Sequence, residues 1–299
     1  MITPKKNIKE VALTAASFQL SGLALNCQST HIILCLHGWL DNAASFTPIL
    51  QYFQSQPYFN HKIIAIDLPG HGASTHKSID AHYHFVDWVY DVLSLFESNQ
   101  WGSVHLVGHS MGGMVASAFS AAFPEKVKSL TLLDSAGFMY SNEQESTQVL
   151  REGLLSRIKA NKNASRSSLS YKNKQLSLDL VTKARVFVSD LSYHHAKLIM
   201  ARNLLFSDNQ WHWRSDRKLN TVSPYRFSFS QCQKIVSDIK VPVQIIYGNK
   251  SVYFVKNGIK CFAPLMPCKK IVELEGGHHV HMEKPAETAK LINAFISLY

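Results

Sequence analysis

A serine stands among glycines in the segment Gly108-His-Ser-Met-Gly-Gly113. The apolar run 104–107 precedes it, and the stretch of small apolar residues 114–123 follows it. This is the strand–turn–helix context of a G-x-S-x-G nucleophile elbow, whose serine hydroxyl is exposed on a tight, strained turn. Amide groups at the start of the following helix favour negative charge on a nearby oxygen. We therefore predict that Ser110 is a catalytic nucleophile.

A second candidate segment, His37-Gly-Trp-Leu-Asp41, follows another apolar run. An acyl-transfer enzyme needs two amide groups that converge on the developing oxyanion. We predict that these are the amides of Met111, directly after the nucleophile, and of Trp39 in this early loop. We expect His37 to be a structural hydrogen-bonding residue rather than a catalytic one.

Three histidines lie close together near the C-terminus, after Gly276 and Gly277. When the catalytic residues follow the order nucleophile, acid, histidine, the base lies in a loop after the last strand. His278 directly follows the Gly-Gly turn and is the predicted base, while His279 and His281 could line the site or pack against the next helix. A metal site is the other interpretation of this cluster, but no second His/Asp cluster accompanies it, so we expect no metal.

The third member of the site is an acid that orients the histidine. The turn Gly248-Asn-Lys-Ser251, which follows an apolar run, contains no carboxylate. Asp134 ends a neighbouring apolar run and could reach the same histidine, holding its tautomer and stabilising the imidazolium. Asp134 is the predicted acid; Asp216 and the absence of any acid are the alternatives.

Short apolar runs alternate with helical patterns along much of the chain. This alternation predicts an α/β fold, with a mostly parallel sheet flanked by helices. The expected strands are 8–26, 31–37, 62–67, 104–107, 130–134, 241–247 and 271–274, and the expected helices are 85–96, 114–123 and 285–298.

The alternation stops between Asp134 and Val241. We expect residues 1–138 and 231–299 to form the core, and residues 139–230 to form an inserted, mainly helical cap over the carboxyl ends of the strands, where α/β sheets bind ligands. Residues 139–226 contain 15 Lys and Arg and 7 Asp and Glu, so most of the net charge of +10 belongs to this segment. Its polar stretch 161–174 is expected to be mobile. Expected pocket residues are His109, His279 and Trp213.

Composition excludes several classes of protein. Among the 299 residues there is no apolar run near the ~20 residues that span a bilayer. Five cysteines without a C-x-x-C spacing favour a reducing compartment, and we expect a cytoplasmic protein without disulfides. No motif points to nucleic acid or to a cofactor, and the oligomeric state is not predicted.

Four motifs together resemble the α/β-hydrolase superfamily, and within it the serine hydrolase-like branch. They begin at Leu36 (LHGWLDNA), Asp67 (DLPGHGAS), Gly108 (GHSMGG) and Gly277 (GHHVHMEKP). The resemblance implies Ser110 as nucleophile, His278 as base, and the amides of Trp39 and Met111 as the oxyanion hole. Many members carry the acid at 248–251, where this sequence has none.

The expected activity is hydrolysis of a carboxylic ester, or of a thioester or lactone, through an acyl-enzyme on Ser110. Such a carboxylesterase-like enzyme needs no cofactor. Two alternatives are C–C bond hydrolase or haloperoxidase-like chemistry at the same site, and an inert ligand-binding protein that keeps the fold.

Overall fold

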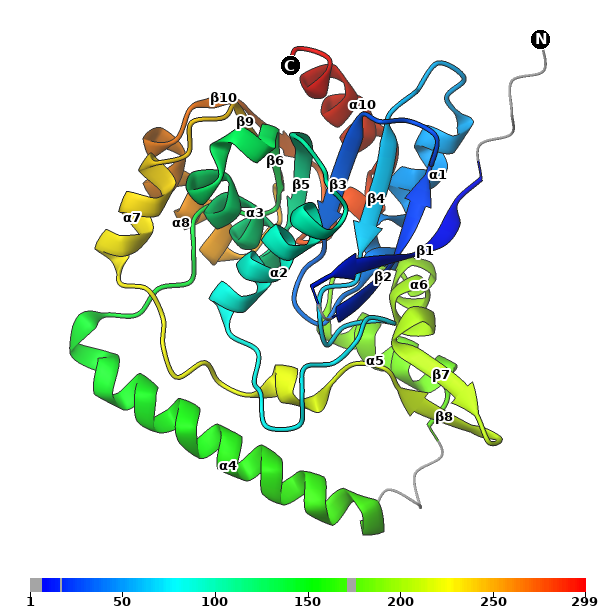
Figure 1. Cartoon of the computed structure of the whole chain (residues 1–299), viewed down its shortest axis with the longest axis vertical. Coiled ribbons are helices and arrows are strands. Elements are labelled where there is room, and N and C mark those ends of the chain that lie inside the picture. Colours follow the sequence, from blue (N-terminus) through cyan, green and yellow to red (C-terminus); the bar gives the residue numbers. More distant parts are fainter. Residues whose placement is uncertain (1–6, 17, 171–175) are drawn as a thin grey trace.

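In the described part of the chain, eight strands form one sheet in the order β1-β2-β4-β3-β5-β6-β9-β10 (Figure 1). The computed structural model describes residues 7–16, 18–170 and 176–299. Strands β1 and β2 are antiparallel to their neighbours, and the other six strands are parallel. The predicted mostly parallel sheet is therefore confirmed. The strands are Lys9–Ala15 (β1), Phe18–Leu25 (β2), Ile32–Leu36 (β3), Lys62–Ile66 (β4), Val104–His109 (β5), Val127–Leu133 (β6), Val243–Gly248 (β9) and Cys268–Leu274 (β10).

Helices cover both faces of the sheet because its central strands are apolar on both sides. Apolar side chains of α2, α3 and α7 pack on one face, and those of α1 and α10 pack on the other. The parallel strands all end at one edge, and the loops after β3, β5, β6, β9 and β10 meet there. The core helices are Thr47–Ser55 (α1), Phe85–Ser98 (α2), Met111–Ala122 (α3), Phe229–Ser237 (α7), Tyr253–Phe262 (α8), Val280–Glu283 (α9) and Pro285–Ile296 (α10).

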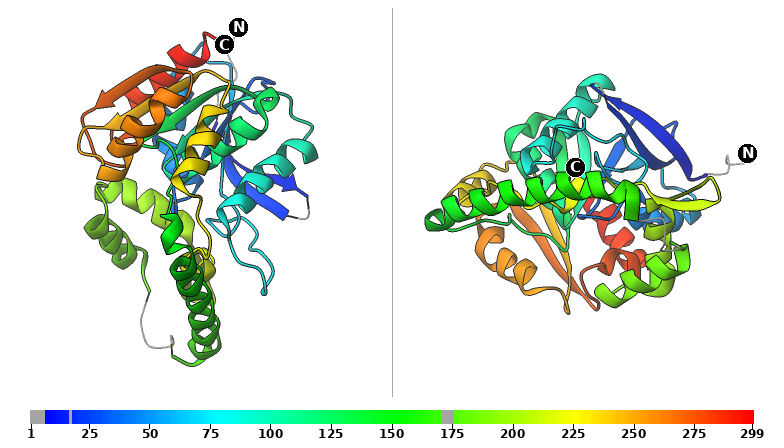
Figure 2. Two further views of the ribbon diagram at one scale, coloured as in Figure 1. Left: turned by 90° about the vertical axis from the view of Figure 1, so that its left-hand side faces the viewer. Right: turned by 90° about the horizontal axis from the view of Figure 1, so that it is seen from below.

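Within the described residues, the long interval between β6 and β9 contains the helices α4, α5 and α6 and a separate two-stranded hairpin, and α7 then returns the chain to the core. Helix α4 crosses below the sheet in Figure 1 and lies in front of it when seen from below in Figure 2. Residues 161–170 of the stretch expected to be mobile form the end of α4, and its residues 171–174 lie outside the described residues. These elements are Ser146–Ser170 (α4), Leu178–Val188 (α5), Tyr193–Asn203 (α6), Leu204–Ser207 (β7) and Gln210–Trp213 (β8).

Helices α5 and α6 have a small apolar core of their own, which includes Val181, Ile199 and Met200. Met282 of α9 belongs to the same cluster, so this part of the interval packs directly beside the loop after β10. None of the helices in the described ranges combines the length and the apolar character needed to cross a bilayer.

Candidate active site

Ser110 lies in the sharp turn between β5 and α3, with φ 49° and ψ −117°. This left-handed conformation is strained for a residue with a side chain, as the nucleophile elbow requires. The turn is possible because its neighbours are glycines. A Cβ on Gly108 would lie 2.6 Å from the Cα of Gly113, and a Cβ on Gly112 would collide with the carbonyl group of Leu36.

The side chains of Ser110, His278 and Asp134 form one hydrogen-bonded chain. The Nε2 atom of His278 lies 2.9 Å from Ser110 Oγ, and its Nδ1 atom lies 2.5 Å from Asp134 Oδ2. The serine and the histidine are partly exposed, whereas the carboxylate is fully buried. An imidazole with a hydroxyl on one nitrogen and a carboxylate on the other has the geometry for accepting the hydroxyl proton.

The turn that lacks a carboxylate provides donors to Asp134. The backbone N–H of Gly248 donates to Asp134 Oδ1 at 2.9 Å, and the Ser251 hydroxyl donates to Oδ2 at 2.5 Å. Together with the His278 ring, these donors satisfy both oxygens of the buried carboxylate. No local signal in the sequence marks this role of Ser251, because the hydroxyl and the carboxylate lie 117 positions apart on two different strand ends.

The loop after β3 lies against the nucleophile. A Cβ on Gly38 would lie 3.3 Å from Ser110 Cβ, so the backbone that carries Trp39 passes directly beside the serine. Met111 is the first residue of α3, and first-turn amides have no acceptor within their own helix. The Trp39 side chain is half exposed and donates from Nε1 to the carbonyl of Leu219, in the 139–230 interval.

His37 has the structural role expected for it. Its ring contacts the carbonyl of Gly38 at 2.7 Å and accepts from the amide of Leu68 at 3.0 Å. Burial lowers the pKa of His37, so the ring is neutral at pH 7. A neutral imidazole that donates from Nδ1 and accepts at Nε2 satisfies both contacts.

The remaining candidates occupy other positions. Asp216 caps a short helical turn by accepting from the amide of Lys218, and it also accepts from the Tyr83 hydroxyl at 2.9 Å. His281 is fully buried, and burial lowers its pKa to about 3. Trp213 ends β8 and is partly exposed.

His109 and His279 are buried, and the contacts of their rings are with protein groups. The Nε2 atom of His109 lies 2.9 Å from the carbonyl oxygen of His278. The two ring nitrogens of His279 lie 2.8 Å from Asp190 Oδ1 and 3.3 Å from Asp41 Oδ2. This geometry favours a supporting position next to His278 over the substrate contact expected for both residues.

The potential metal-ligand atoms of Asp41, His109 and His279 lie within 4.8 Å of one another. Two features of the structure favour an ion-pair cluster instead. The guanidinium of Arg185 lies 2.5 Å from Asp41 Oδ1, and Asp190 engages the other ring nitrogen of His279. A bound cation would have to compete with the positive charge of Arg185.

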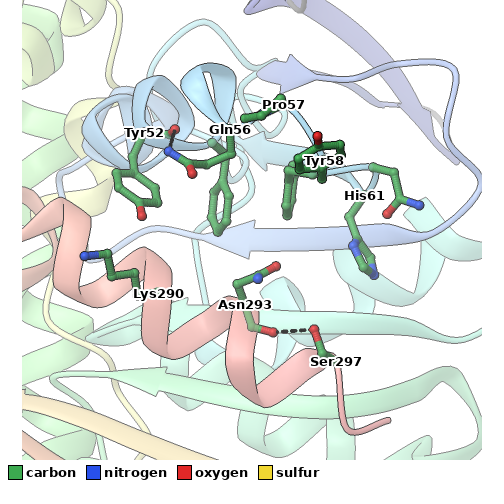
Figure 3. Close-up of a pocket in the computed structure, with 11 residues that line it drawn as sticks. Tyr52, Gln56, Pro57, Tyr58, His61, Lys290, Asn293 and Ser297 are labelled. Atoms are coloured by element: carbon green, nitrogen blue, oxygen red, sulfur yellow. Dashed lines mark hydrogen bonds between the residues drawn. The ribbon is translucent and has the colours of Figure 1, made fainter.

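A cavity of about 300 Å³ lies between α1, the loop that follows it and α10 (Figure 3). Its lining includes Tyr52, Tyr58, His61 and Lys290. The loop 56–61 enters β4 at the amino end of the strand, whereas Ser110 follows the carboxyl end of the parallel strand β5. The cavity is therefore at the opposite edge of the sheet and contributes no group to the site around Ser110.

Known proteins resemble the chain in both sequence and structure. The zebrafish serine hydrolase-like protein is 29% identical over 88% of this chain and 81% of its own length. Human monoacylglycerol lipase ABHD6 is 28% identical over 89% of this chain and 75% of its own length. A hypothetical protein from Pseudomonas aeruginosa superimposes with a TM-score of 0.84 at 27% identity, covering 97% of this chain and 99% of that one.

The family profile described as the alpha/beta hydrolase fold matches residues 31–285. That range runs from β3 through the loop that carries His278, and so includes all the residues of the candidate site. The chain therefore belongs to the alpha/beta hydrolase fold family.

Proposed function

We propose that the protein is a serine hydrolase that cleaves carboxylic esters through an acyl-enzyme on Ser110. The observation that carries the proposal is the continuous chain from Ser110 Oγ through the His278 ring to the buried carboxylate of Asp134. The proposal is supported by the family membership and by the curated relatives named as serine hydrolase-like proteins and a monoacylglycerol lipase.

In the first step, Ser110 Oγ attacks the carbonyl carbon of the ester while His278 Nε2 accepts the hydroxyl proton. The amides of Trp39 and Met111 hold the oxyanion of the tetrahedral intermediate. The bond to the leaving alcohol then breaks, and His278 returns the proton to the departing oxygen. Asp134 keeps the Nδ1 proton of His278 in place and stabilises the imidazolium.

In the second step, a water molecule attacks the acyl-enzyme. His278 accepts a proton from the water, and the carboxylic acid leaves as Ser110 regains its proton. Every step uses groups of the chain together with substrate and water. We further propose that residues 139–230 act as a cap that shapes the acyl pocket, and that the enzyme works in the cytoplasm, where its five free cysteines would stay reduced.

The test is labelling with a fluorophosphonate probe, alongside hydrolysis of 4-nitrophenyl esters, thioesters and lactones of increasing acyl length. Wild type should label and turn over, and Ser110→Ala should label at background level and lose on the order of 10⁶-fold in kcat. Labelling without hydrolysis of any of these substrates would favour C–C bond hydrolase or haloperoxidase-like chemistry. A folded wild type that neither labels nor hydrolyses would contradict the proposal and favour a ligand-binding protein.

A further inference from the structure

The peptide unit that joins His278 to His279 is held at both of its polar atoms. Its carbonyl oxygen accepts from Nε2 of His109 at 2.9 Å, and its N–H group donates to Asp190 Oδ2 at 3.0 Å. His109 directly precedes the nucleophile, while Asp190 comes from the 139–230 interval. Because this peptide unit adjoins the Cα of His278, its orientation helps to set where the imidazole points.

The second oxygen of the Asp190 carboxylate extends the contact. Asp190 Oδ1 lies 2.8 Å from Nδ1 of His279, and Nε2 of the same ring lies 3.3 Å from Asp41 Oδ2. Arg185, one turn before the end of α5, completes the chain through its contact with Asp41 Oδ1 and lies 3.3 Å from His279 Nε2. These four residues, the buried Asp41 and His279 and the more exposed Arg185 and Asp190, are called the charge cluster below.

The charge cluster joins three segments that are far apart in the sequence. Asp41 is two residues after Trp39 in the proposed oxyanion loop, and His279 is next to the proposed base. Arg185 and Asp190 belong to the interval between β6 and β9. The interval therefore contacts both of the loops that the proposed mechanism needs.

The charges of the cluster balance when all four groups are ionised. Burial alone would lower the pKa of His279, but the carboxylates of Asp41 and Asp190 raise it to about 9. Burial alone would raise the pKa of Asp190, but the hydrogen bond and charge of His279 hold it well below its usual range. Two cations and two anions then face one another: Asp190 contacts His279, and Asp41 contacts both His279 and Arg185.

Gly277, the residue before His278, allows the Asp190 carboxylate to reach the backbone of the base loop. Gly277 lies directly against the Asp190 side chain, and a Cβ on it would be 2.9 Å from the Cβ of Asp190. With glycine at position 277, the Asp190 carboxylate can approach the backbone closely enough to accept a hydrogen bond from the amide of His279.

We propose that Asp190 is a positioning residue: the carboxylate of a residue in the 139–230 interval holds the backbone of the base loop so that His278 stays aligned between Ser110 and Asp134. This inference rests on the proposed function for its kinetic consequences. It adds that the interval takes part in aligning the base as well as bordering the substrate. Removal of the carboxylate frees the N–H of His279 and leaves the imidazolium with one carboxylate partner.

The test compares Asp190→Ala and Asp190→Asn with the matched control Asp179→Asn, which changes an exposed carboxylate of the same interval. The active fraction is titrated with the fluorophosphonate probe, and kcat is expressed per active site. We expect kcat of Asp190→Ala to fall by at least about tenfold with KM within twofold of wild type, since small misplacements of a catalytic group are costly. Asp190→Asn should be intermediate, and Asp179→Asn unchanged.

A wild-type kcat per active site in folded Asp190→Ala would overturn the proposal, even if thermal stability falls. If Asp190→Ala does not fold, the same criterion applies to Asp190→Asn. A second readout is independent of turnover: the downfield proton resonance of the His278 Nδ1–H bonded to Asp134 should broaden or disappear in the Asp190 variants. A sharp, unshifted resonance in both variants would overturn the proposal whether or not the wild type proves to be a hydrolase.

Discussion

The Ser251 hydroxyl donates a hydrogen bond to Asp134 across 117 positions of the sequence. Ser251 follows β9, and Asp134 follows the adjacent parallel strand β6. The strand end that lacks an acid therefore supplies donors to an acid on the neighbouring strand. The proposed triad keeps its geometry although the carboxylate comes from a different strand.

Substitution of Ser251 by alanine should weaken the site without abolishing it. The change leaves one oxygen of a buried carboxylate with fewer donors, and a hydrogen bond to a charged group contributes about 1.5–3 kcal/mol. We expect the free energy of unfolding in urea to fall by about this amount and kcat to fall several-fold. Ser237→Ala, at an exposed position, is the control and should change neither quantity. An unchanged stability in Ser251→Ala would show that the hydroxyl is not bonded to the carboxylate.

Asp134→Asn should be far more damaging to turnover than to folding. An amide at this position favours the wrong tautomer of His278, and the corresponding change in a serine protease costs about 10⁴-fold in kcat. The measurement is kcat on a 4-nitrophenyl ester with the active fraction determined by probe titration. Activity within tenfold of wild type would remove Asp134 from the triad.

The double variant Asp134→Ser with Ser251→Asp provides a stricter comparison, because it exchanges the carboxylate and the hydroxyl between the two strand ends. We expect it to be at least about tenfold more active than Asp134→Ser alone, since a carboxylate at 251 starts from a position already in contact with the site. Equal activity of the single and double variants would show that the position of the acid cannot be moved between the strands.

The charge on His279 predicts a specific loss of stability at alkaline pH. The folded-state pKa of His279, about 9, lies above its ordinary value of 6.5, so protonation stabilises the folded state. This contribution is fully present below pH 6.5 and is lost as the pH rises through 9, and it amounts to about 3 kcal/mol. Urea unfolding of wild type and His279→Gln between pH 6 and 10 should show their stabilities converging as the pH rises. Parallel curves would contradict the assigned charge.

A buried ion pair between Arg202 of α6 and Asp67 connects this helix to the core. The Nε atom of Arg202 lies 3.0 and 2.9 Å from the two oxygens of the fully buried Asp67. Arg202→Ala leaves that carboxylate without its charge partner and should cost about 3–5 kcal/mol in urea unfolding. Lys183→Ala, which removes an exposed pair with Asp179, should leave the free energy of unfolding close to that of wild type. Similar losses of unfolding free energy in the two variants would contradict the prediction that the buried pair stabilises the fold more than the exposed pair.

The sheet and the elbow could be predicted because their signals are local. A strand buried on both faces is a short apolar run, and the glycines around Ser110 mark a turn that only small residues allow. Asp134 could be named as a candidate because the carboxyl ends of parallel strands meet at one edge. The proposed catalytic geometry follows from features that each occupy a few consecutive residues.

The contacts of the interval 139–230 could not be predicted in the same way. Asp190 meets His279 across 89 positions, and Arg185 meets Asp41 across 144, so no local periodicity or motif connects them. Both contacts depend on how α5 packs on the core. The same limit applies to His279, for which the sequence suggested substrate contact and whose ring contacts Asp190 and Arg185 of this interval.

The most direct test of the central claim is to trap the acyl group. Wild type is mixed with a 4-nitrophenyl ester and quenched in acid within the first turnovers, and the digested protein is examined by mass spectrometry. The acyl mass should appear on the peptide that contains Ser110, and it should be absent from Ser110→Ala treated in the same way. Turnover by wild type with no acyl mass on that peptide, or with an equal adduct in Ser110→Ala, would contradict an acyl-enzyme on Ser110.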